Sequence, residues 1–331
     1  METSLFDYEL PASAIAQTPV TPRDASRLLI DGNTIEHKLV RDLPSLLHPG
    51  DLVVLNNTRV MQARLNLYKA TGGAVEVLVL KEKSEGLWEA LVRPSRKVAS
   101  GTFLYDVSRD PVIQVMGEGS ENTRIIRPID GTIREVMETC GKIPLPPYIT
   151  TDLEDSERYQ TVFAKHETSV AAPTAGLHLT QSVLDAVRLA GANVVSVELS
   201  VGLGTFRPID ASTVSDHFMH EESYQINPET WAKLLQAERV IAIGTTVVRA
   251  LEAAAITEDL TGKTNLFIKP EFEFKIVQGL LTNFHLPRSS LLVMIEAFIG
   301  PRWRDLYSIA LSEGYRFLSF GDAMFLQRDA V

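Results

Sequence analysis

The sequence predicts a mixed α/β protein whose main domain is formed from both ends of the chain, with a small antiparallel β-barrel inserted between them. Three features support this prediction. An apolar strand ends at Leu55, a series of short β-type runs then follows, and helices alternate with strands from about Tyr148 onward. Short runs separated by turns are typical of barrels, and alternation is typical of α/β domains. We therefore expect residues 1–58 and 148–331 to form one domain and residues 59–147 another.

The composition is that of a globular protein. The chain has 331 residues, of which 45% are hydrophobic and 22% charged, and its mean hydropathy is +0.03. The net charge of −10 argues against a protein that binds nucleic acid over its whole surface, although a local basic patch remains possible. Cys140 is the only cysteine, which excludes an intrachain disulfide and a CxxC metal site.

Targeting and membrane segments are not expected. The N-terminal residues carry acidic side chains and no basic stretch before an apolar core, so they do not form a signal peptide. The longest apolar runs fall far short of the roughly 20 residues that cross a bilayer. We expect a cytoplasmic protein that does not contact a membrane.

The inserted segment is predicted to consist of strands and one helix. Runs rich in Val, Ile, Leu and aromatic residues occupy residues 74–80, 87–92, 101–107, 111–116 and 123–129. Helical periodicity over more than two turns occurs at residues 132–140. The proline-rich stretch at 143–147 is a stiff connector typical of a domain boundary.

The C-terminal half predicts the remaining elements of the main domain. Thr180 can cap a helix that stops at Gly191, and a strand follows it. The further expected helices are 228–238, 245–256, 291–299 and 303–314. The further expected strands are 239–244, 265–270 and 274–282.

Two glycine-containing junctions are candidate ligand sites. Gly244, Thr245 and Thr246 join a strand to a helix, where free N–H groups and the positive end of the helix dipole bind anions. A threonine that only caps the helix explains this junction equally well. Gly202 and Gly204 follow another strand, but the third glycine of the dinucleotide fingerprint is missing, so a plain turn is the alternative.

Three histidine-containing segments add polar candidates. His217, His220 and Glu222 have spacing that fits metal ligands, an acid–base cluster or a solvated loop. The segment 171–180 brings His178 after a small-residue turn, and 282–287 brings His285 after a strand. Each histidine taken singly is more often structural than catalytic. Because several of these segments lie where a predicted strand meets a turn or a helix, the residues alone predict an α/β enzyme that binds a polar small molecule.

Basic residues are concentrated in and beside the insertion. Arg59 and Arg64 lie near its start, and Arg93, Arg96 and Lys97 form the densest basic patch of the chain. A patch this short is usually a solvated loop, so an RNA-facing role needs an independent reason.

Long motifs along the chain supply that reason. Those of the first half are FDYELP (6–11), PRDASRLL (22–29), PGDLVVLNNTRVMQARL (49–65), TGG (71–73), PLPPYI (144–149) and ERYQTVFA (157–164). Those of the second half are SVAAPTAGLH (169–178), VGLGTF (201–206), HFMHEE (217–222), GTTVVRALE (244–252), LLTNFHLP (280–287) and YRFLSFGDAM (315–324). With these motifs in this order, the chain resembles the S-adenosylmethionine:tRNA ribosyltransferase-isomerase family of queuosine biosynthesis.

The resemblance implies an α/β domain with an inserted β-barrel and an unusual use of S-adenosylmethionine. The ribosyl group of this donor moves to 7-aminomethyl-7-deazaguanine at the tRNA wobble position and isomerises, giving epoxyqueuosine with release of adenine and methionine. S-adenosylmethionine is consumed as a co-substrate, so no cofactor and no metal is implied. The partners are the donor and a tRNA with a modified wobble guanine, and we expect a monomer.

The resemblance also suggests roles for individual residues. The candidate acids and bases are His178, His217, His220 and His285, with Glu222 orienting an imidazole or facing the sulfonium. Gly244, Thr245 and Thr246 suit the methionine carboxylate, and Asp322 suits the ribose hydroxyls or the amine of the donor. The other expected substrate-binding residues are Thr174, Gly176, Gly202, Gly204, Thr205, Arg249 and Asn283. The expected tRNA-binding residues are Arg59, Arg64, Arg93, Arg96 and Lys97.

The chain departs from the family pattern at two notable positions. Ser200 stands where the family has His, and Gln278 stands where it has Asp. Two other hypotheses stand beside the enzyme. The departure at Ser200 supports a catalytically impaired paralogue that still binds tRNA or the nucleoside donor. The other, which sets the resemblance aside, is a metal-dependent hydrolase that uses His217, His220 and Glu222.

Overall fold

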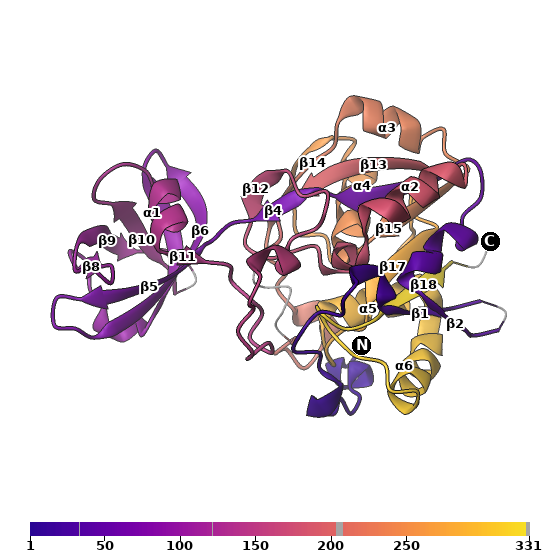
Figure 1. Cartoon of the computed structure of the whole chain (residues 1–331), viewed down its shortest axis with the longest axis horizontal. Helices are drawn as coiled ribbons and strands as arrows, with labels where there is room; N and C mark the ends of the chain where they lie inside the picture. Colours follow the sequence, from indigo (N-terminus) through magenta and orange to yellow (C-terminus); the bar gives the residue numbers. More distant parts are fainter. Residues whose placement is uncertain (33, 121, 203–207, 329–331) are drawn as a thin grey trace. The chain divides into compact units, whose positions relative to one another are not determined.

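The computed structural model describes residues 1–32, 34–120, 122–202 and 208–328. The chain divides into two compact units, one made of Met1–Arg59 with Pro146–Val331 and the other of Val60–Leu145 (Figure 1). In the described part of the chain, no helix is both long enough and apolar enough to span a bilayer.

The smaller unit is a closed antiparallel barrel. Its strands follow the order β5 (Arg64–Lys69), β6 (Ala74–Ser84), β7 (Leu87–Arg93), β10 (Arg124–Pro128), β9 (Pro111–Glu118) and β8 (Phe103–Tyr105). Pairing of β8 back to β5 closes the ring, which leaves no free edge within it. The expected helix is α1 (Ile133–Cys140), capped by the Thr132 side chain, and β11 (Gly141–Lys142) then pairs with β5. The predicted barrel is therefore confirmed.

The larger unit is built on a mixed sheet. Its order is β16 (Thr261–Thr264), β14 (Glu222–Gln225), β13 (Asn193–Leu199), β3 (Asp51–Asn56), β15 (Arg239–Ile243), β17 (Gly279–Asn283), β18 (Ala323–Gln327), β1 (Arg27–Ile30) and β2 (Glu36–Leu39). The central strands β13, β3, β15 and β17 are parallel, so their carboxyl ends share one edge. A separate pair joins β4 (Thr58–Val60) to β12 (His166–Ser169).

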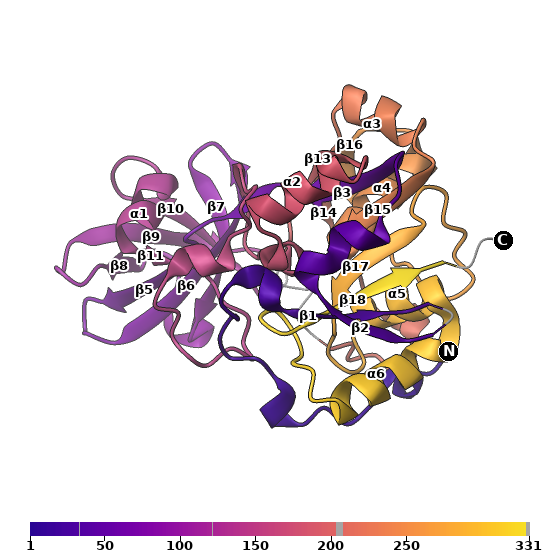
Figure 2. The ribbon, with the colours of Figure 1, turned by 45° about the vertical axis from the view of Figure 1, so that its right-hand side comes forward.

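Both faces of this sheet are buried, and alternate residues of each strand supply the two cores. In β3, Leu52 and Val54 point into one core while Val53 and Leu55 point into the other. Helices α4 (Thr245–Thr257), α5 (Ser290–Ile299) and α6 (Trp303–Ser312) cover the first face. Helix α2 (Gln181–Leu189) and the 3-10 segment Val40–Leu46 cover the second, and Figure 2 shows these layers from the side of α2.

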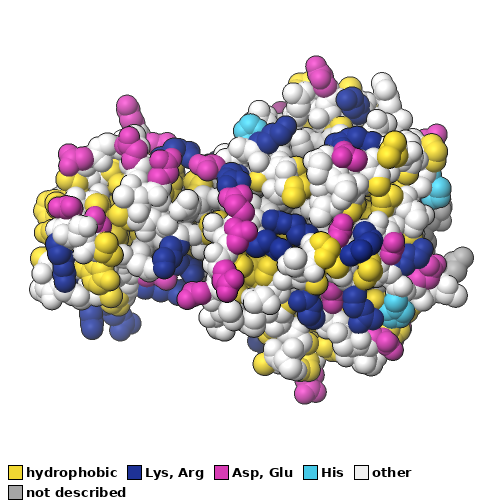
Figure 3. Space-filling model, in the orientation of Figure 1, with side chains coloured by type: hydrophobic (Ala, Val, Ile, Leu, Met, Phe, Trp, Pro, Cys, Tyr) yellow, Lys and Arg dark blue, Asp and Glu magenta, His cyan; other side chains and the backbone are white. Residues whose placement is uncertain are grey.

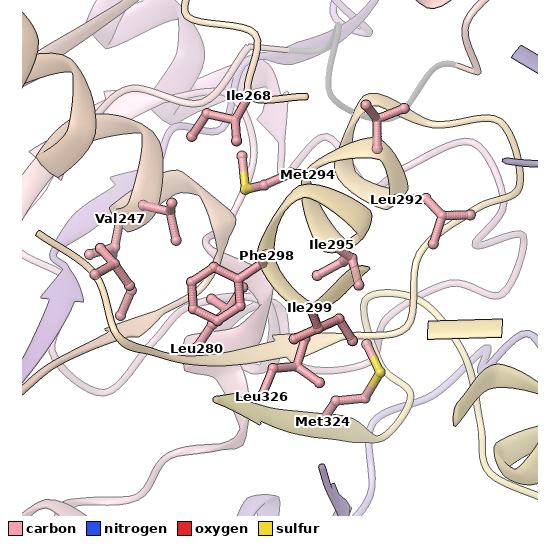
Figure 4. Close-up of a cluster of buried hydrophobic side chains, with 14 of the residues drawn as sticks. Val247, Ile268, Leu280, Leu292, Met294, Ile295, Phe298, Ile299, Met324 and Leu326 are labelled. Carbon is pink, nitrogen blue, oxygen red and sulfur yellow. The ribbon is translucent and has the colours of Figure 1, made fainter. Parts of the chain in front are cut away.

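The packing of α5 illustrates the first core. Figure 4 shows Ile295 and Phe298 of this helix beside Leu280 of β17 and Leu326 of β18. All four side chains are at most 4% exposed. Burying side chains of this size stabilises the fold by about 1.5–3 kcal/mol each, so this interface fixes β17 and the residues that follow it.

Two of the expected strands differ from the structure. Residues 265–270 are not a strand; β16 precedes them, and Ile268 reaches the core without ladder pairing. The strand expected at 274–282 begins only at Gly279. The buried Glu252 carboxylate accepts the N–H groups of Lys275, Ile276 and Val277, which are therefore not available to a neighbouring strand. The short helix α3 (Pro228–Leu234) ends earlier than expected.

Candidate active site

The carboxyl ends of β15 and β17 carry two of the predicted motifs side by side. Gly244 follows β15, and Asn283 ends β17. The 3-10 turn Thr174–His178 packs over both ends: Thr174 bonds Asn283, and Ala175 Cβ lies 3.6 Å from where a Cβ on Gly244 would be. Segments about 110 residues apart in the chain therefore meet at the edge where α/β sheets bind ligands.

Asn283 is the centre of a buried polar chain. Its Nδ2 donates to His178 Nε2 over 2.8 Å, and its Oδ1 accepts from Thr174 Oγ1 over 3.0 Å. Because the amide donates, Nε2 of His178 is the acceptor, so the ring proton lies on Nδ1, which is 2.9 Å from Ser26 Oγ. The hydrogen-bonded chain thus runs Ser26, His178, Asn283, Thr174, and both ring nitrogens of the histidine take part in it.

Burial keeps His178 neutral. Its pKa is lowered to about 3, first by desolvation and then by the nearby positive charges of Arg316 and Arg23. The imidazole is 4% exposed and carries no charge at physiological pH. With both nitrogens engaged, His178 holds the Asn283 amide in one orientation.

His285 is a second neutral imidazole at the same edge. Its Nε2 lies 2.9 Å from Thr282 Oγ1, and burial lowers its pKa to about 3. Two tyrosines fix its backbone, since Tyr307 Oη accepts its N–H over 2.9 Å and Tyr8 Oη donates to its carbonyl over 2.5 Å. No partner of Nδ1 is found among the residues that the structure describes.

A small cavity lies beside these groups. Its volume is about 30 Å³, and its polar lining includes Thr174, Asn283 and His285 together with Tyr148 and Ser319. Tyr148 Oη and Ser319 Oγ are 2.7 Å apart. A space of this size holds about one water, next to the polar groups of the lining.

Glu222 and Arg249 form a buried ion pair. One carboxylate oxygen accepts from the Arg249 guanidinium, and the other accepts the Gly202 N–H over 3.0 Å. Arg249 also donates to the carbonyls of Leu266 and Thr264. Burial raises the pKa of Glu222, and the charge of Arg249 opposes this. The pair ties together β14, α4 and β16; substrate binding by Arg249 stays a prediction.

This pairing bears on the metal hypothesis. The Glu222 carboxylate is directed to Arg249, while His217 is half-buried with its ring against Phe267 and His220 is exposed. In the described ranges, no group of three His, Cys, Asp or Glu side chains is arranged to hold a metal ion. Burial and the neighbouring His220 lower the pKa of His217. Nothing in this segment supports a metal-dependent hydrolase.

Asp322 and Gly176 have clear structural roles. The buried Asp322 carboxylate accepts the backbone N–H groups of Arg27 and Arg316, each over 2.8 Å. It thereby joins the start of β1 to the loop between α6 and β18. A Cβ on Gly176 would lie 2.8 Å from the Phe163 ring, so a larger residue there would force that ring to move. Ligand contacts by either residue stay predictions, and Gly204 and Thr205 lie outside the described residues.

The two departures from the family pattern lie at opposite edges of the sheet. Ser200 follows β13 at the carboxyl edge, and its N–H donates to the Ser223 carbonyl over 2.9 Å. Gln278 precedes β17 at the other edge, where its side chain accepts the Val240 N–H over 2.7 Å. Gln278 is therefore remote from the candidate site, whereas Ser200 lies at the same edge of the sheet as the site, two strands away from β15.

The expected tRNA-binding residues fall into two groups. Arg59 pairs with Glu157 and Glu167, and Arg64 lies 3.7 Å from Glu76. Arg93, Arg96 and Lys97 are exposed in and beside the 3-10 turn Ser95–Lys97. On the face that Figure 3 shows, acidic and basic side chains are interspersed, in keeping with the net charge of −10.

Several residues of the site were not predicted from the sequence. Ser26 lies 152 positions from His178, and no spacing rule links residues so far apart. Tyr8 and Tyr307, which hold the His285 backbone, come from the N-terminus and from α6. The motifs PRDASRLL and FDYELP, which contain Ser26 and Tyr8, were the available signal.

Comparisons with known proteins match the chain along its length. A family model described as "Queuosine biosynthesis protein" matches residues 3–326. Proteins named S-adenosylmethionine:tRNA ribosyltransferase-isomerase are similar, at 47% identity in Thermotoga petrophila and 45% in Moorella thermoacetica, each covering 98% of this chain and 100% of the relative. A crystal structure of S-adenosylmethionine tRNA ribosyltransferase from Thermotoga maritima is 37% identical, covers 97% of this chain and 99% of that one, and gives a TM-score of 0.56.

Proposed function

Because the chain belongs to the queuosine biosynthesis protein family, we propose that it is an S-adenosylmethionine-dependent tRNA ribosyltransferase-isomerase. It transfers and isomerises the ribosyl group of S-adenosylmethionine onto 7-aminomethyl-7-deazaguanine at the wobble position of tRNA. The products are epoxyqueuosine in the tRNA, adenine and methionine. The observation that carries this proposal is the match over 98% of the chain to enzymes of that name.

The donor is a co-substrate and not a cofactor. Its sulfonium acidifies the neighbouring C5′ hydrogens, so a positioned base can form an ylide, and adenine then departs as the ribose opens. This chemistry needs neither a metal nor a redox group. We expect the protein to work as a monomer in the cytoplasm.

His285 is the proposed proton acceptor of this reaction. A neutral imidazole is the form that accepts a proton, and burial keeps both His178 and His285 in that form. The acceptor nitrogen of His178 is already bonded to Asn283, whereas His285 borders the small cavity. His178 then acts as a positioning residue, since it orients Asn283 and through it Thr174.

The tRNA substrate is proposed to contact the exposed basic patch of the barrel, formed by Arg93, Arg96 and Lys97. Phosphate binding is electrostatic and needs solvent-accessible cations, which these side chains provide. Arg59 and Arg64 are already paired with carboxylates, so they contribute less.

The reaction is tested by mass spectrometry of nucleosides. Purified protein is incubated with S-adenosylmethionine and tRNA that carries the aminomethyl-deazaguanine precursor. Epoxyqueuosine should form together with equal amounts of adenine and methionine. If donor and tRNA bind without forming product, the enzyme proposal fails and a binding paralogue, with Ser200 as its cause, takes its place.

The role of His285 is tested by His285→Gln. Glutamine keeps a polar group near Thr282 Oγ1 but is not a base, so turnover should fall by about 10²–10⁴-fold, the range for loss of general acid–base catalysis. His48→Gln removes an exposed imidazole and is the control. Full turnover by His285→Gln would assign proton transfer to another group.

A further inference from the structure

The N-terminus of α4 has no side-chain cap. Helix α4 runs for 13 residues from Thr245, and Gly244 precedes it with φ of +94°. Its first turn has no acidic residue, and no side chain bonds the N-cap. Among the described residues, no acceptor is found for the N–H groups of Thr245 and Thr246, so the positive end of the helix dipole is not compensated there.

A buried hydroxyl without a partner lies at the same place. Thr246 is 8% exposed, and its Oγ1 is buried with no hydrogen-bond partner among the described residues. The oxygen is directed toward the start of the helix, since it lies 3.7 Å from where a Cβ on Gly244 would be. Leaving a hydroxyl without a hydrogen bond in the interior costs about 1–3 kcal/mol, and a ligand that accepts a hydrogen bond from it would recover this free energy.

The helix start belongs to the candidate active site. Ala175 packs against Gly244, and the adjacent Thr174 bonds Asn283. The positive φ of Gly244 favours glycine at this position. The anion-binding groups and the Ser26, His178, Asn283, Thr174 chain therefore lie around the same two strand ends.

We propose that the N-terminus of α4, with the Thr246 hydroxyl as a specific donor, binds the carboxylate of the amino-acid portion of the donor. The inference rests on the proposed function. The carboxylate is the anionic group of S-adenosylmethionine; its amine and its sulfonium are cationic. A carboxylate has two oxygens, so it can accept from the hydroxyl and from the helix N–H groups at once.

The proposal predicts discrimination by the carboxylate. S-adenosylmethionine should bind at least tenfold more tightly than its decarboxylated analogue, S-adenosyl-3-methylthiopropylamine. Thr246→Val keeps the shape of the side chain but removes the hydroxyl. This substitution should weaken the binding of S-adenosylmethionine by about 10- to 100-fold, the range for a hydrogen bond to a charged group, and leave binding of the analogue unchanged. Thr246→Ser should restore most of the loss.

The experiment is equilibrium dialysis of both ligands with the wild-type protein and the two variants, alongside the nucleoside assay. Thr257→Val, at the opposite end of α4, is the matched control. Equal weakening of both ligands by Thr246→Val, or no discrimination by the wild type, overturns the proposal. If the protein discriminates between the two ligands but forms no epoxyqueuosine, the carboxylate site stands and the proposed reaction is wrong. If it forms epoxyqueuosine but does not discriminate, the reaction stands and the carboxylate site is wrong. If neither ligand binds, both proposals fall.

Discussion

Acid should destabilise the α/β unit through its buried imidazoles, and His285 allows the size of this effect to be worked out. A histidine in the unfolded chain has a pKa near 6.5, and burial lowers the pKa of His285 to about 3. Between these two values the unfolded chain binds a proton that the folded protein does not. The contribution of neutral His285 to the free energy of unfolding is therefore fully present above pH 6.5 and is lost as the pH falls toward 3.

The magnitude at pH 5 follows from linkage. At pH 5 the pH lies about 1.5 units below the pKa of the unfolded imidazole. Protonation of the unfolded chain then favours unfolding by about 2 kcal/mol, compared with about 0.2 kcal/mol at pH 7. The folded pKa lies so far below pH 5 that protonation of the folded form contributes almost nothing. His178, with the same lowered pKa, contributes a similar amount.

Urea unfolding at pH 5 and pH 7, followed by tryptophan fluorescence, measures the effect. His285→Gln has no group that titrates there, so its loss of stability between pH 7 and 5 should be about 2 kcal/mol smaller than that of the wild type. Burial raises the pKa values of Glu222 and Glu252, which act in the opposite direction but equally in both proteins. His48→Gln is the control. An identical loss in the wild type and in His285→Gln would refute the neutral, buried state of this imidazole.

Two further predictions concern charges elsewhere. Glu222→Gln leaves the Arg249 guanidinium buried without its counter-charge and should lower the free energy of unfolding by about 3–5 kcal/mol, measured by urea titration, while the exposed neighbour Glu221→Gln should change little. Reversing the charges of the patch at 93, 96 and 97 to Glu should weaken tRNA binding and lower the salt slope by about 0.7–0.9 for each phosphate that is no longer neutralised, measured by filter binding at several salt concentrations. Unchanged binding would place the tRNA on another surface.

Local patterns were sufficient to predict the fold class. Alternating apolar residues in β3 serve the two cores on either face of the sheet, and the short runs of the insertion close into a barrel. The failures have tertiary causes. The stretch before Gly279 has strand composition, but the buried Glu252 carboxylate accepts its N–H groups, and the partners lie 23 to 25 residues apart, outside the local pattern that predicts a strand.

The candidate site divides in the same way. The positions of Gly244 and Asn283 at strand ends, and of His178 just before α2, could be predicted, because each lies at or beside the end of a regular element. Their interactions could not, since the Ser26 hydroxyl and the Tyr8 phenol come from the other end of the chain. The pairing of Glu222 with Arg249 also engages the carboxylate that the metal hypothesis required, and the sequence spacing could not show this.

The neutrality of the two buried imidazoles is consistent with a cationic donor. A protonated histidine would repel the sulfonium of S-adenosylmethionine, whereas His178 and His285 are uncharged well below physiological pH. In the proposed reaction His285 takes a C5′ proton and the sulfonium becomes a neutral ylide, so the positive charge moves to the imidazole and the total charge of the site is unchanged. A low pKa makes His285 a weak base on its own. The carboxylate proposed at the start of α4 would add a negative charge at the neighbouring strand end, which favours the charged ring and should raise that pKa. The two proposals are thereby linked, and Thr246→Val should slow proton transfer to His285 as well as weaken binding of the donor.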